Sequence, residues 1–366
     1  MMMKHIATTL ALAGALCAEE ILPEDSLSLQ VFASLLKEYP GNIAYSPLSL
    51  ESALETLREY SGGETRAELD KLPYAEFNCP QFDIDVKQAS GLFVDKNMPL
   101  QPGVQGAISL DFTQAQQAAD TINSWCSKHT EGRISQIVQA ANISPITAFI
   151  ATDAIYMKAD WKYPFRKNAS FEGEFHTADG KTVPVNMMRN TANYNVYKGE
   201  DWVAVALPYA STKPMGNTVY FVAICPTENA REFAAKLSYA QYREILGHLE
   251  GNDVKTQLIM PSFTVEGDAM CLNSALKAAG LNRIFTDADF SRLTTSKKPL
   301  FLEKILQKCY VKVDEQGTEA AAVTATFVSY KAMTRTVMLN RPFIWFITDG
   351  FDGWTAPLFM GIYEQP

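Results

Sequence analysis

Residues 315–326 have a composition and spacing that suit one kind of chemistry, the backbone hydrogen bonding of a β-strand. The segment runs Glu-Gln-Gly-Thr-Glu-Ala-Ala-Ala-Val-Thr-Ala-Thr and lacks the Asn, Asp and Pro that are typical of loops. Because strand side chains alternate between two faces, one face carries only small or β-branched side chains: Thr318, Ala320, Ala322, Thr324 and Thr326, continued by Val328. A face without charge or bulk can enter a buried position, so we expect this segment to form a strand.

Side chains for catalysis are scarce by comparison. The chain has four histidines, and His5 lies in an N-terminal segment that we expect to be removed; the others are His129, His176 and His248. There is no Gly-x-Ser-x-Gly nucleophile motif, no His-Glu-x-x-His zinc motif and no phosphate-binding P-loop. We therefore expect neither an enzyme nor a cofactor or metal site.

Helical patterns occupy the first half of the chain. Ser46 suits the N-cap position and Pro47 the first helical position. A helical stripe of apolar residues follows and ends near Gly62: Leu48, Leu50, Ala53, Leu54 and Leu57. A second helix is predicted over residues 115–128, ending near Gly132.

Strand patterns dominate the second half. We predict strands over residues 148–157 and 304–313, and two late apolar strands over residues 343–347 and 358–363. Helices early and strands late indicate an α+β fold. The chain has 366 residues, 47% of them hydrophobic, which is enough for a large core. Neither a linker nor an internal repeat divides it.

Four motifs, in order along the chain, resemble the serpin family of serine protease inhibitors. Residues 42–50, Asn-Ile-Ala-Tyr-Ser-Pro-Leu-Ser-Leu, are similar to the entry of its helix B, and residues 153–161 to the strand that ends in its buried tryptophan. Residues 315–322, followed by Asn-Arg-Pro-Phe at 340–343, resemble the hinge and distal end of its reactive-centre loop. Residues 357–361, Pro-Leu-Phe-Met-Gly, resemble its C-terminal strand.

The resemblance implies a serpin fold over residues 19–366, with a large central sheet, surrounding helices and an exposed reactive-centre loop at about residues 315–341. It also implies a suicide-type inhibitor of serine proteases, in which the cleaved loop inserts into the main sheet as a new strand. The implied hinge residues are Glu315, Gly317, Thr318, Glu319, Ala320, Ala321 and Ala322. The alternative is a non-inhibitory serpin that acts as a carrier, a chaperone or a mere substrate.

The reactive bond follows from the family's loop spacing. Inhibitory members place the residue before the cleaved bond fourteen positions after the hinge glycine, which gives Lys331, with Ala332 after the bond. Counting back eleven positions from Pro342 also gives Lys331. A lysine here indicates a trypsin-like target protease, whose specificity pocket holds a carboxylate. A one-residue offset gives Tyr330 and a chymotrypsin-like target, and residues 328–329 suit elastase-like enzymes.

Two further groups of residues match functional positions of the family. The "shutter" at the centre of the main sheet corresponds to Ser46, Ser49, Asp153 and Gln307. The family usually has an Asn and a His where this chain has Asp153 and Gln307, and a buried carboxylate is costly unless it is paired or protonated. We expect these two to form a hydrogen bond. Trp161 matches the "breach", at the top of the sheet where the loop would first enter.

The expected partner is a target serine protease, and the protein is expected to act as a monomer. About twenty residues separate Leu72 from Leu92, where larger members have a further helix that carries heparin-binding basic residues in some of them. We therefore expect no heparin dependence. The net charge of -9 likewise disfavours nucleic acid.

The first 18 residues are typical of a secretory signal peptide. Lys4 and His5 precede an apolar run over residues 6–16, and small residues precede Glu19. We expect cleavage after Ala18 and a secreted, periplasmic or cell-envelope protein. A lipid anchor at Cys17 is the less favoured alternative, because Leu16 occupies a position where small residues are expected.

Overall fold

The computed structural model describes residues 26–74, 84–211, 218–298, 300–318, 335–351 and 357–366. The predicted signal peptide, most of the predicted hinge and the predicted reactive bond lie outside these ranges. The described helices are α1 (Leu27–Glu38), α2 (Pro47–Tyr60), α3 (Gly63–Leu69), α4 (Ala115–His129), α5 (Ala230–Lys236), α6 (Tyr239–Leu249) and α7 (Asn273–Ala278). None of them combines the length and the apolar character needed to span a membrane.

Strands form two sheets. The larger has the order β1 (Ile43–Tyr45), β16 (Phe359–Tyr363), β15 (Phe343–Asp349), β8 (Val219–Pro226), β7 (Trp202–Pro208), β6 (Thr182–Lys198), β9 (Asp253–Pro261) and β14 (Arg335–Met338), with β5 (Phe171–His176) beside β6. The second has the order β10 (Phe263–Glu266), β12 (Ile305–Val313), β13 (Gly317–Thr318), β4 (Phe149–Asp160), β2 (Asp85–Asp95) and β3 (Ala107–Leu110), with β11 (Met270–Cys271) beside β12.

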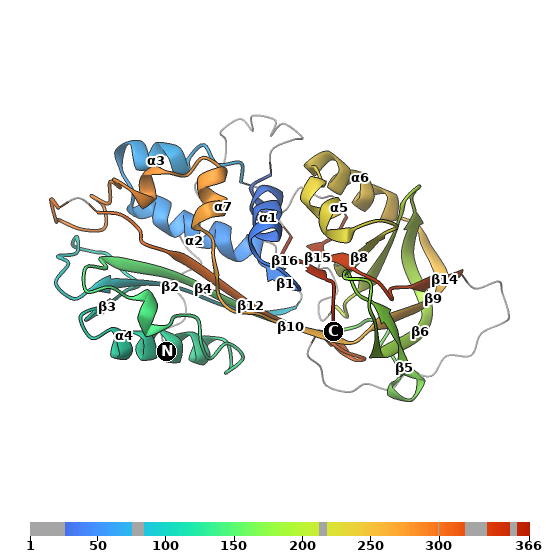
Figure 1. Ribbon diagram of the computed structural model, residues 1–366. Helices are drawn as coiled ribbons and strands as arrows, with labels where there is room; N and C mark the ends of the chain where they lie inside the picture. The colour runs from blue at the N-terminus through green and yellow to red at the C-terminus, as the bar shows by residue number, and fades with distance from the viewer. Residues whose placement is uncertain (1–25, 75–83, 212–217, 299, 319–334, 352–356) are drawn as a thin grey trace.

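Helices cover both faces of the second sheet. In Figure 1, α1, α2, α3 and α7 lie above the strands β2, β4 and β12, and α4 lies below them. The remaining helices, α5 and α6, pack on the larger sheet. This mixed arrangement confirms the predicted α+β fold.

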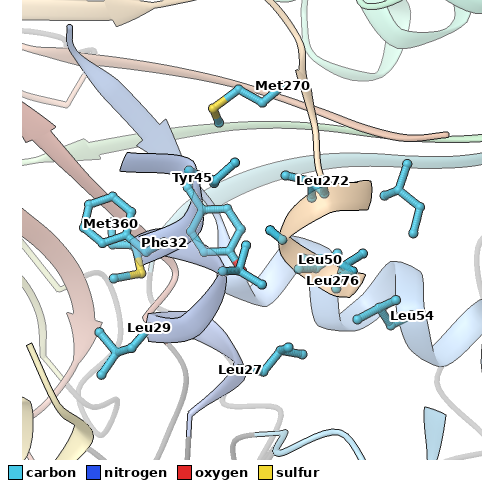
Figure 2. Close-up of a cluster of buried hydrophobic side chains, with 14 of the residues drawn as sticks. Leu27, Leu29, Phe32, Tyr45, Leu50, Leu54, Met270, Leu272, Leu276 and Met360 are labelled. Atoms are coloured by element: carbon cyan, nitrogen blue, oxygen red, sulfur yellow. The ribbon is translucent and has the colours of Figure 1, made fainter. Parts of the chain in front are cut away.

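The hydrophobic patterns explain where the elements pack. α2 begins at Pro47, and the Ser46 hydroxyl accepts a hydrogen bond from the Ser49 backbone N–H, as the cap motif predicted. The apolar side of this helix is buried with α1 and α7, as Figure 2 shows for Leu50, Leu54 and Leu276. A separate cluster holds α4 against the opposite face of β2 and β4.

The chain between α3 and β2 is short. Residues 75–83 lie outside the described ranges, and the described residues between Leu69 and Asp85 form no α-helix. The absence of a further helix between α3 and β2 therefore remains a prediction for residues 75–83.

Candidate functional site

The two inner strands of the second sheet, β4 and β12, form a seam that is closed along part of its length and parted at one end. From Ile305 to Tyr310, β12 pairs directly with β4 in parallel, and Gln307 lies opposite Asp153. Beyond this stretch, β13 lies between the two strands and pairs antiparallel with both. This β4–β12 seam is therefore already opened by two residues, Gly317 and Thr318.

Gly317 can lie in the seam because it has no side chain. A Cβ atom at this position would overlap the carbonyl oxygen of Ala159 and crowd the Cα of Asp160. Thr318 follows, opposite Ala159 on one side and Val313 on the other, and is completely buried. The remaining predicted hinge residues, Glu319, Ala320, Ala321 and Ala322, lie outside the described ranges.

The backbone before β13 is held by the segment that follows β4. The Trp161 backbone N–H donates to the Gln316 carbonyl oxygen at 2.8 Å, and its indole Nε1 donates to the Asp314 carbonyl oxygen at 2.9 Å. The Phe165 N–H donates to the Glu315 carbonyl oxygen at 2.7 Å. The structure thus places Trp161 at the entrance of the seam. Its predicted role at the breach remains a prediction.

The side chain of Glu315 is fixed as well. Its Oε1 accepts hydrogen bonds from Ser170 Oγ at 2.8 Å and from Asn186 Nδ2 at 3.1 Å. Glu315 therefore binds polar groups from two other parts of the chain, one after β4 and one on β6. These contacts anchor the start of the loop to the larger sheet.

Tyr209 also lies at the entrance of the seam, although no sequence pattern indicated this residue. Its hydroxyl lies 2.8 Å from Thr318 Oγ1, and either group can be the donor. The ring stacks on Trp161, with centroids 4.6 Å apart and an interplanar angle of 11°. Burial raises the pKa of Tyr209, so it is neutral at physiological pH. A tyrosine directly after the apolar strand β7 carries no distinctive sequence signal, and only its contact with Thr318 reveals its position at the entrance.

The four predicted shutter residues meet at the closed part of the seam. Gln307 Nε2 donates to Asp153 Oδ2 at 2.9 Å and to the Ser46 carbonyl oxygen at 2.9 Å. Gln307 Oε1 accepts from the Ser46 backbone N–H at 2.9 Å. The amide is thereby fixed by the start of α2. The expected Asp153–Gln307 hydrogen bond is present, and a functional role for the group remains a prediction.

Asp153 is buried among hydrogen-bond donors. Besides Gln307, Ser49 Oγ donates to Oδ1, and Ser90 Oγ on β2 donates to Oδ1 at 2.9 Å. Desolvation raises the pKa of Asp153, and the hydrogen bonds from Ser49, Gln307 and Ser90 oppose this without cancelling it. This carboxyl group therefore takes up a proton more readily than an exposed aspartate does.

The far end of the loop returns to the larger sheet. β14 pairs in parallel with β9, from Arg335 opposite Thr256 to Met338 opposite Ile259. The Asn340 carbonyl oxygen then accepts from the His176 N–H at 2.8 Å. The predicted reactive bond between Lys331 and Ala332 lies between these two anchored ends, outside the described ranges.

The described residues offer no group of three or more His, Cys, Asp or Glu side chains placed to hold a metal ion. Their cysteines are free, with Cys126, Cys225 and Cys309 buried and Cys271 partly buried. The contacts described at the seam are backbone hydrogen bonds and hydrogen bonds of single polar side chains such as Glu315, Tyr209 and Gln307.

Comparisons with known proteins agree with this geometry. A family model described as "Serpin (serine protease inhibitor)" matches residues 24–366. Plasminogen activator inhibitor 1 of Bos taurus is 26% identical over 359 residues, covering 89% of this chain and 87% of that protein. An uncharacterized serpin-like protein of Thermococcus kodakarensis is 30% identical over 372 residues, covering 91% and 83% respectively.

Solved structures show the same fold. Tengpin, a thermophilic serpin in its native state, has a TM-score of 0.78 and 24% identity, covering 96% of this chain and 95% of its own. Native protease nexin-1 with heparin has a TM-score of 0.78 and 23% identity, covering 94% and 99%. The similarity to these two structures concerns the fold alone.

Proposed function

Because its sequence matches the serpin family model over residues 24–366, this chain belongs to the serpin family of serine protease inhibitors, and we propose that it traps trypsin-like proteases by inserting its cleaved loop between β4 and β12. The observation that carries the proposal is the position of β13. Gly317 and Thr318 lie between these strands and pair antiparallel with both. These two residues therefore already occupy the position that the first pair of an inserted strand would take.

The register of β13 indicates where further loop residues would lie. In an antiparallel ladder, each step forward along the loop is one step back along its neighbours. Thr318 lies opposite Ala159 and Val313, so continuation in the same register brings Thr324 opposite Asp153 and Gln307. This continuation requires the parting of β4 from β12 and the loss of the Asp153–Gln307 hydrogen bond.

The same register brings small residues to apolar levels. Ala320 and Ala322 would face the same side as Thr318, at the levels of Met157 and Ile155, which are buried in one cluster with Ala159. A charged or bulky side chain there would lose hydration or clash. The uncharged face of the loop is thus matched to the apolar side of the seam.

The chemistry belongs to the target protease. Its serine Oγ forms an ester with the carbonyl carbon of Lys331, the Lys331–Ala332 peptide bond breaks, and Ala332 leaves with a free amine. The freed loop then inserts while the protease remains attached through Lys331. Hydrolysis of the ester competes with insertion, so inhibition requires insertion to be faster than deacylation.

A denaturing gel tests this proposal directly. The purified mature protein is mixed with trypsin, and a band near the summed mass that survives boiling is expected. N-terminal sequencing of the released fragment should begin at Ala332. Complete cleavage without such a band, with trypsin, chymotrypsin and elastase alike, would contradict the inhibitory function and favour a non-inhibitory serpin.

Two loop variants assign the reactive bond. Lys331→Ala should slow trypsin trapping strongly, because it removes the side chain that pairs with the carboxylate of the trypsin pocket. Arg335→Ala is the matched control. Arg335 is also a basic residue of the predicted loop, it is exposed, and it is the first residue of β14. Equal rates for both variants would assign the cut to another bond, and Tyr330 would be tested next with chymotrypsin.

We also propose that the protein is exported and acts as a monomer without heparin. Support comes from the N-terminal pattern and from the net charge of -9. Expression of the full chain should yield a mature protein that begins at Glu19. An N-terminus modified by lipid at Cys17 would replace this proposal, and faster protease trapping with added heparin would refute heparin independence.

A further inference from the structure

Thr318 and Tyr209 form a buried polar contact at the entrance of the seam. Both side chains are essentially inaccessible to solvent, and their oxygens lie 2.8 Å apart. A buried hydroxyl without a partner is unfavourable. Withdrawal of Thr318 would remove the partner that the structure gives to the Tyr209 hydroxyl.

The position of Tyr209 is itself rigid. Its backbone N–H donates to the Val219 carbonyl oxygen at 2.9 Å, and the residue forms a β-bridge with Trp161. The Trp161 ring stacks on the tyrosine ring, and its Nε1 donates to the Asp314 carbonyl oxygen. These contacts hold the tyrosine ring in place, so the Tyr209 hydroxyl points into the seam at the level of Thr318.

We propose that Tyr209 is a positioning residue that holds the uncleaved loop at its first inserted pair and so fixes the register in which the strand grows. This inference rests on the proposed function and names a residue that controls it. The contact with Thr318 can persist during insertion, because continuation of the ladder leaves Thr318 opposite Ala159 and Val313. It favours both the uncleaved and the inserted states over a state with the loop withdrawn.

The contact between Tyr209 and Thr318 should affect the rate of insertion after cleavage. A loop held at its first pair does not have to find the seam after cleavage, whereas a withdrawn loop must first re-enter. Re-entry delays insertion, and the protease has more time to hydrolyse the ester. Loss of the contact should therefore raise the number of inhibitor molecules consumed for each protease trapped.

Tyr209→Phe and Thr318→Val each remove one hydroxyl and keep a similar shape. Each should raise the stoichiometry of inhibition roughly three- to fivefold, the effect of one lost hydrogen bond. The double variant should behave like either single variant, because both remove the same contact. Tyr60→Phe is the control: it loses a 2.7 Å hydrogen bond to the Gln105 carbonyl oxygen instead, and should leave the stoichiometry unchanged.

Hydrogen–deuterium exchange of the uncleaved protein, without protease, tests the contact separately. The backbone amides of residues 317–318 should exchange faster in both variants than in the wild type. Unchanged exchange in both variants, or additive effects in the double variant, would overturn the proposal. If Tyr209→Phe does not fold, Thr318→Val alone decides by the same criteria.

The two proposals fail in distinguishable ways. If the wild-type protein traps no protease, the proposed inhibitory function fails, and faster exchange in the variants would still support the positioning of the loop by Tyr209. If trapping is efficient and neither stoichiometry nor exchange responds to the variants, the inhibitory function stands and the role of Tyr209 is refuted.

Discussion

Asp153 is a single side chain whose hydrogen bonds depend on whether the seam is closed. It accepts hydrogen bonds from Ser49 on α2, from Ser90 on β2 and from Gln307 on β12. Insertion of a strand between β4 and β12 would separate Asp153 from Gln307, since neighbouring strands lie about 4.8 Å apart. Thr324, which the register brings to this level, has a hydroxyl that can replace the lost donor.

The raised pKa of Asp153 predicts a pH dependence of stability. Its value in the unfolded chain is about 3.9, and desolvation raises the pKa in the folded protein. The folded state therefore binds this proton more tightly. The contribution of Asp153 to the free energy of unfolding is greatest below about pH 4 and is lost as the pH rises through the folded pKa.

The variant Asp153→Asn cannot titrate at this position. Its free energy of unfolding, minus that of the wild type, should therefore increase from about pH 4 toward neutrality. Asp111→Asn is a control of opposite sign, because hydrogen bonding to Lys96 lowers the pKa of this partly exposed carboxyl group. Its free energy of unfolding, minus that of the wild type, should decrease with rising pH, and only below about pH 4. Parallel pH profiles for wild type and Asp153→Asn, measured by urea unfolding, would mean that Asp153 has an ordinary pKa.

In the proposed mechanism insertion begins at Thr318, so substitutions of this residue test the mechanism directly. Thr318→Arg places a long charged side chain where the native residue is completely buried beside Tyr209. We expect the covalent complex to fall more than about tenfold, because a buried charge without a partner is strongly disfavoured, while loop cleavage continues. The readout is the ratio of complex to cleaved protein on a denaturing gel. Thr318→Ser keeps the hydroxyl and should trap nearly as well; a fully active Arg variant would exclude insertion from this hinge.

At the scale of elements, the start of α2 bridges both sides of the seam. Ser46 binds the Gln307 amide on β12 through its backbone N–H and carbonyl groups, and Ser49 donates to Asp153 on β4. The Ser46 hydroxyl also donates to the Leu358 carbonyl oxygen at 2.5 Å, just before β16. One helix terminus therefore connects the two sheets at the level that the proposed insertion would open.

The short strand β13 depends on a glycine. Gly317→Ala introduces a Cβ that would overlap the Ala159 carbonyl oxygen, and backbone cannot move away as a flexible side chain can. We expect β13 to leave the seam, which hydrogen–deuterium exchange at residues 317–318 should reveal as lost protection. Gly247→Ala is the control, because a Cβ on that helical glycine would meet no atom within 4 Å. Retained protection in Gly317→Ala would show that the seam can widen at this end.

At the scale of the whole molecule, the proposed function requires the second sheet to accept one further strand. The second sheet is closed from Ile305 to Tyr310 by direct pairing of β12 with β4, and among the described residues Gly317 and Thr318 lie between these strands. An inserted loop would gain ladder hydrogen bonds on both edges and bury its small apolar side chains. The native protein is thus expected to be less stable than its loop-cleaved form.

Thermal unfolding measures this difference. Protein cleaved within residues 319–334 should unfold more than about 10 °C above the uncleaved protein, since a gain of several kcal/mol raises the midpoint by a few degrees per kcal/mol in a large domain. Cleaved Thr318→Arg should show a smaller rise, because its loop cannot enter fully. An identical midpoint for cleaved and uncleaved wild type would argue against insertion.

The α+β class, the start of α2 at Pro47 and the strands β4 and β12 could be predicted from local patterns, because periodicity and capping are local properties. The sequence motifs also indicated the shutter residues, which the structure brings together. The contacts of Gly317 and Thr318 within the seam, the meeting of Tyr209 with Thr318 and the binding of Ser46 by Gln307 became visible in the folded molecule alone. These partners lie 109 and 261 positions apart. Contacts across such separations depend on strand register and packing, which the whole fold sets and no local pattern encodes.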